Sequence, residues 1–80
     1  MNLARNKNRE RVIDPVGPEK LRDWLLANMI SDESLAGDLG VSIYAVRKYK
    51  SGHRVPRGLV MRKMELITGI PLGDWFVTLA

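Results

Sequence analysis

Apolar side chains recur at helical spacing in several separate segments of the chain. The spacing of Leu21, Trp24 and Leu25 predicts a helix over about 18–29, with these side chains on one face. A second apolar stripe near the end of the chain predicts another helix over about 57–68. The members of this stripe are Val60, Met61, Met64 and Ile67.

Between these two segments the pattern predicts a pair of short helices, over about 32–39 and 43–50, joined at Gly40. Ser31 and Ser42 precede them, and a serine there can accept a hydrogen bond from a free backbone N–H of the first turn. Glycine adopts the left-handed backbone that ends a helix at little cost. The expected inward side chains are Leu35, Ala36, Leu39, Ala45, Val46 and Tyr49. Such a hinged pair presents its second helix to a groove.

The two ends of the chain lack a comparable apolar face. Residues 1–16 are rich in Asn and Arg, and we interpret them as a flexible basic arm. The cations of this arm are Arg5, Lys7, Arg9 and Arg11. Their side chains either enter a nucleic-acid groove or face water. Residues 74–79 predict a short fifth helix. No alternating apolar pattern of strand length is present, so we expect an all-α domain over 17–80, a compact bundle of about five short helices.

Composition excludes several classes of protein. Eighty residues suffice for one small domain, and the absence of cysteine excludes disulfides and thiolate metal sites. His53 is the only histidine, so we expect no metal site, and neither a cofactor nor a small-molecule substrate. The sequence contains no set of titratable groups in an arrangement typical of an active site, so we do not expect an enzyme. No apolar run reaches the length of a membrane span or forms a signal peptide, which favours a cytoplasmic protein.

The charges are divided unevenly along the chain. Residues 17–41 contain two basic and five acidic side chains, whereas residues 42–63 contain seven basic side chains and no Asp or Glu. The seven are Arg47, Lys48, Lys50, Arg54, Arg57, Arg62 and Lys63. A basic segment that coincides with a presented helix favours a polyanion as partner, and double-stranded DNA above all.

The hinged segment resembles the phage repressor and Cro-like helix-turn-helix family, often called the xenobiotic-response-element family, from about Leu21 to Trp75. The matching residues are Ser31, Leu35, Ala36, Leu39, Gly40, Val41, Ser42, Val46, Gly52 and Pro56. This resemblance implies a lambda-repressor-like bundle of about five helices. It also implies a transcriptional regulator that binds a two-fold DNA operator as a homodimer, near the nucleoid of a bacterial or phage-infected cell.

The resemblance also assigns roles to individual positions. Base edges are read in this family at the positions occupied here by Ile43, Tyr44, Arg47 and Lys48. Arg47 suits this role because a guanidinium can donate two hydrogen bonds to guanine O6 and N7. We expect phosphate contacts at Ser42, Lys50, His53, Arg54 and Arg57. Asp32 stands where the family frequently has a glutamine, and we expect its carboxylate to turn away from phosphate and cap its helix.

Two alternatives remain open on the sequence alone. The helix-turn-helix unit binds either DNA or another protein, such as a transcription component or a cognate regulator, and salt-dependent and sequence-dependent duplex binding distinguishes these cases. Trp75 and Phe76 either close the core of the protein or form a dimer interface.

Overall fold

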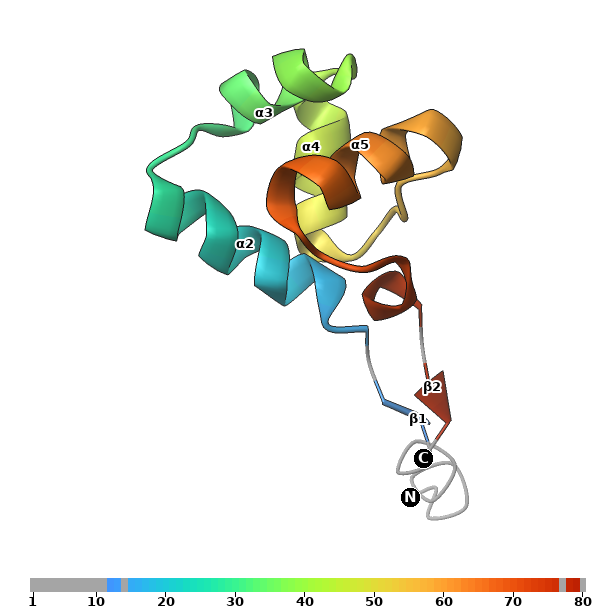
Figure 1. Cartoon of the computed structure of the whole chain (residues 1–80). Coiled ribbons are helices and arrows are strands. Elements are labelled where there is room, and N and C mark those ends of the chain that lie inside the picture. Colours follow the sequence, from blue (N-terminus) through green and yellow to red (C-terminus); the bar gives the residue numbers. More distant parts are fainter. Residues whose placement is uncertain (1–11, 14, 77, 80) are drawn as a thin grey trace.

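The computed structural model describes residues 12, 13, 15–76, 78 and 79, and helices dominate this part of the chain (Figure 1). The four α-helices are α2 (Gly17–Asn28), α3 (Asp32–Leu39), α4 (Ile43–Ser51) and α5 (Gly58–Thr68). The remaining elements are a 3-10 helix η1 (Leu72–Trp75) and two short strands, β1 (Val12–Ile13) and β2 (Thr78–Leu79). The all-α class is confirmed for the body of the molecule, and each α-helix begins and ends within one residue of its predicted range.

A single apolar core lies between the four α-helices and η1, and α4 packs against both α2 and α3. The buried hydrophobic residues are Leu21, Leu25, Leu35, Ala36, Leu39, Ala45, Val46, Tyr49, Met61, Met64, Ile70 and Trp75. All six inward side chains predicted for the hinged pair are among them. No polar or charged side chain of the described residues is fully buried, so packing of apolar groups holds this domain together.

Local hydrogen bonds fix the hinge between α3 and α4. Gly40 has φ 75° and ψ 33°, and the N–H groups of Gly40 and Val41 donate to the carbonyl of Ala36 at 2.9 and 3.0 Å. Ser31 Oγ accepts from the N–H of Ser34 at 3.0 Å at the start of α3. The predicted left-handed glycine and the predicted serine cap of α3 are therefore both confirmed.

The prediction of a helix over 74–79 is wrong. The chain forms η1 over 72–75, and β2 at 78–79 pairs with β1, Thr78 with Ile13 and Leu79 with Val12, in an antiparallel register. Two physical reasons explain this difference. The Phe-Val-Thr run at 76–78 consists of residue types that favour extended backbone, and two-residue strands are too short to produce an alternating pattern. The strand pair extends away from the helices (Figure 1).

Only part of the predicted basic arm lies within the described residues. Val12 and Ile13 form β1, while residues 1–11 and 14 lie outside the described part of the chain. The four cations assigned to the arm belong to that outer range.

Trp75 closes one end of the core against the first turn of α2. It is 1% exposed, and a Cβ added at Gly17 would lie 2.6 Å from Trp75 Cδ2. A 2.5 Å ion pair between Lys20 Nζ and Asp74 Oδ2 also joins α2 to η1. Trp75 thus belongs to the core of the protomer and is withdrawn from the candidate dimer interface, whereas Phe76 is 51% exposed.

We expect Gly17→Ala to lower the free energy of unfolding by about 1–2 kcal/mol, because the new methyl group overpacks the indole ring. Urea denaturation measures the change. Gly73→Ala is the matched control, since a Cβ at position 73 meets nothing within 4 Å. Equal stability of the two variants would show that Trp75 does not rest on Gly17.

Candidate nucleic-acid interface

Helix α4 has one buried face and one exposed face. Ala45, Val46 and Tyr49 are buried, and the opposite face carries Tyr44, which is 67% exposed, and Arg47. The exposed face also includes Lys48, and Ile43 at the first position of α4 is partly buried. The four side chains that are predicted to read bases therefore lie on or beside the exposed face of α4, and the opposite face of α4 is packed in the apolar core.

The first turn of α4 begins at Ser42, whose Oγ accepts from the N–H of Ala45 at 3.1 Å. This contact confirms the predicted cap. No acidic residue occupies the first turn of α4, and Lys48 and Lys50 occupy its last turn. Cations at this end are stabilised by the helix dipole, and the start of α4 remains free of negative charge.

Arg47 lies between an aromatic ring and a carboxylate. Its Cζ is 5.7 Å from the centroid of the Tyr44 ring, within the range of a cation–π contact. Its Nε is 3.9 Å from Asp32 Oδ2, which is an ion pair at the limit of direct contact. Within the described residues no hydrogen bond occupies the two Nη atoms of Arg47, so they stay free to donate elsewhere.

Asp32 does not cap α3, because Ser31 fills that role. Instead its two carboxylate oxygens accept hydrogen bonds from Lys50 Nζ, at 2.9 and 3.1 Å. The expectation that Asp32 caps α3 is therefore wrong. Lys50, one of the predicted phosphate contacts, has its ammonium paired with Asp32 across the α3–α4 interface.

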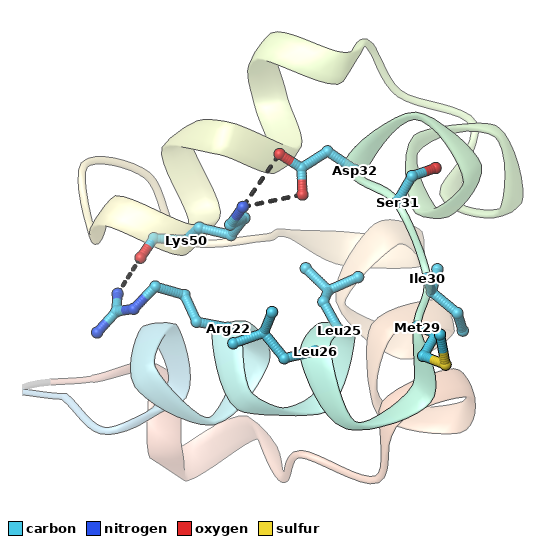
Figure 2. Close-up of a pocket in the computed structure, with 8 residues that line it drawn as sticks. All are labelled: Arg22, Leu25, Leu26, Met29, Ile30, Ser31, Asp32 and Lys50. Atoms are coloured by element: carbon cyan, nitrogen blue, oxygen red, sulfur yellow. Dashed lines mark hydrogen bonds and ion pairs between the residues drawn. The ribbon is translucent and has the colours of Figure 1, made fainter.

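Figure 2 shows the surroundings of this ion pair. Arg22 on α2 donates through Nη1 to the backbone carbonyl of Lys50 and so ties α2 to the end of α4. The pair borders an open pocket of about 680 Å³ between α2, the α2–α3 connection and Lys50. The apolar lining residues of this pocket are Leu25, Leu26, Met29 and Ile30.

The remaining predicted phosphate contacts follow the end of α4. His53, Arg54 and Arg57 are all exposed in the segment between α4 and α5. His53 Nδ1 lies 2.7 Å from Ser51 Oγ, which orients the imidazole ring. No hydrogen bond or ion pair within the described part of the chain engages the guanidinium group of Arg54 or Arg57. The exposed cations of α4 and of this segment are Arg47, Lys48, Arg54 and Arg57.

Sequence reasoning missed the contacts made by Asp32 and Arg22. Each joins residues far apart in the sequence, and only the packing of α2 and α3 on α4 brings them together. The sequence contained one signal for Asp32. Asp32 is a carboxylate in the first turn of α3, and the segment from 42 to 63 contains seven basic residues and no acidic residue to pair with them. The nearest cations of that segment were its natural partners.

Two features are absent from the described residues. No helix there is long and apolar enough to cross a membrane. No group of three or more potential metal-ligating side chains occurs in the same part of the chain. In comparisons with known proteins, no family model, no curated protein and no solved structure matches this chain.

Proposed function

We propose that this protein is a sequence-specific DNA-binding transcriptional regulator that places α4 in the major groove. In this proposal α3, the turn at Gly40 and α4 form a helix-turn-helix unit within a lambda-repressor-like domain. The observation that carries it is the exposed face of α4, where Tyr44, Arg47 and Lys48 point away from an apolar anchor. A helix held in this way fits the major groove, where base pairs differ in their donor and acceptor patterns.

The exposed residues divide by chemistry into two roles. Arg47 can donate to guanine O6 and N7, and Ile43 or Tyr44 can contact a thymine methyl group. Arg54 and Arg57 are exposed beyond α4, and in this proposal they contact phosphates, which give affinity without sequence preference. The protein then binds as a dimer, with half-sites about 34–36 Å apart along the duplex. The exposed side chain of Phe76 is the candidate dimer contact that remains after Trp75 is assigned to the core.

The test is selection of bound duplexes from a random pool, followed by titration of the selected duplex and of random duplex at several salt concentrations. We expect a clear preference for the selected sequence and an affinity that falls with salt. A protein that prefers no sequence, or binds duplex weakly at every salt concentration, is not such a regulator. That outcome favours the use of the same helices for binding another protein.

We expect Arg47→Ala to weaken binding to the selected duplex by about 1–3 kcal/mol and to relax the preference at one base pair. Arg54→Ala is the matched control, because it removes the same side chain and the same charge beyond the end of α4. It should weaken all duplexes alike and reduce the salt slope by about 1. Fluorescence anisotropy measures both effects, and identical behaviour of the two variants would contradict the division of roles.

A further inference from the structure

Asp32 is an unexpected feature of a surface that binds a polyanion. Its side chain is 21% exposed, it lies beside the cationic face of α4, and its negative charge repels a DNA phosphate, which has the same sign. The carboxylate is not needed at the start of α3, since Ser31 Oγ already caps the helix. It serves instead as the shared anionic partner of two cations of α4, since it accepts hydrogen bonds from Lys50, the shorter at 2.9 Å, and forms a looser ion pair with Arg47 at 3.9 Å.

We propose that Asp32 determines the sequence specificity of this protein by restraining Arg47 and Lys50, an inference that rests on the proposed DNA-binding function. Asp32 engages the Nε side of the Arg47 guanidinium, while Tyr44 lies 5.7 Å from its Cζ. This leaves the two Nη atoms to meet a guanine. Asp32 is a positioning residue, because it acts through Arg47 and touches no base itself.

The same contact lowers the part of the affinity that does not depend on sequence. Lys50 is held by both oxygens of Asp32, and the carbonyl of Lys50 is held by Arg22, so the ammonium is directed toward the protein (Figure 2). Phosphates carry no sequence information, so this loss of affinity applies to every duplex alike. A duplex without the matching guanine also gains nothing from Arg47, and specificity, which is a difference between two affinities, therefore depends on how Arg47 is held.

The experiment compares Asp32→Asn with Glu33→Gln. Both variants remove one negative charge from the first turn of α3, but Glu33 is exposed and has no ion pair within the described residues. Affinity is measured by anisotropy for the duplex selected by the wild-type protein and for a random duplex of equal length. The Arg47 Nε–H signal is followed by NMR in the free protein.

We expect Asp32→Asn to tighten binding to random duplex and to steepen the salt slope by about 1, because Lys50 becomes free for a phosphate. The ratio of selected to random affinity should fall about tenfold, since Arg47 is no longer directed to its base. The Arg47 Nε–H signal should shift. Glu33→Gln should change the ratio and the signal little. If Asp32→Asn is too unstable to assay, Asp32→Asn with Lys50→Met removes both charges of the pair, and the same fall in the ratio is expected.

The outcomes separate the two proposals. A wild-type protein with no preference between the two duplexes overturns the proposed function and this inference with it. A selective wild-type protein whose ratio and Arg47 signal respond equally to Asp32→Asn and Glu33→Gln overturns only the role of Asp32, and the proposed function stands.

Discussion

Trp75→Ala should destabilise the protein more than truncation of any other core side chain, by about 3–5 kcal/mol. Trp75 is the largest of the fully buried side chains, and its ring rests directly on Gly17. The truncation leaves a cavity between η1 and the first turn of α2. Both segments lose contacts with the indole ring, and they can fill the cavity only by giving up other contacts. A domain of 80 residues has a total stability of about 5 kcal/mol, so a large fraction of the variant should be unfolded.

Urea denaturation followed by far-UV circular dichroism measures this loss, and two further variants test its cause. Trp75→Phe should recover most of the stability, because it retains an aromatic ring. It also loses no hydrogen bond, since Trp75 Nε1 has no partner within the described residues. Phe76→Ala should cost about 1 kcal/mol or less in the protomer, because Phe76 is half exposed. A loss for Phe76→Ala that is large at high protein concentration and shrinks on dilution would instead identify Phe76 as part of a dimer interface, because only the wild-type dimer is stabilised by mass action.

Gly40→Val should lower the free energy of unfolding by about 3 kcal/mol, at the upper end of the cost of a strained backbone. Gly40 has φ 75°, a conformation that a β-branched residue rarely adopts. Relief of this strain requires the turn to open, which breaks the hydrogen bonds from Gly40 and Val41 to Ala36. The angle between α3 and α4 then changes, and DNA binding is expected to fall with stability.

Gly37→Val provides the matched control for Gly40→Val. Gly37 lies within α3 with a helical backbone, and a Cβ there meets nothing within 4 Å. The two substitutions add the same atoms three residues apart, yet the change at 37 should be within about 0.5 kcal/mol of zero. Thermal melting of both variants compares them without DNA. Equal melting temperatures would place the hinge elsewhere.

The local pattern was sufficient for most of the helical body. Helix ranges, the serine caps and the glycine at the hinge depend on residues within one turn of each other, so their physical causes are visible in the sequence. The C-terminal segment was different. The helix expected over 74–79 competes with pairing to Val12 and Ile13, more than 60 positions away, and a short window of sequence contains no sign of that partner.

The candidate site shows the same division. The outward positions of α4 follow from helical periodicity, and Tyr44 and Arg47 are exposed as expected. Whether a given cation is free does not follow from periodicity. Lys50 is paired with Asp32 across 18 positions of sequence, whereas Arg54 is exposed, and the two were indistinguishable in the charge pattern.

The sequence by itself determined the class of the fold, the order of the four α-helices, the hinge at Gly40 and the basic character of the segment from 42 to 63. These features arise from backbone preferences, apolar spacing and formal charge, which act locally. The tertiary structure alone decided that Trp75 fills the core and that Asp32 holds Lys50 beside Arg47. Burial and ion pairing depend on which distant side chains packing brings within a few ångströms, and the chain acquires those neighbours only when it folds.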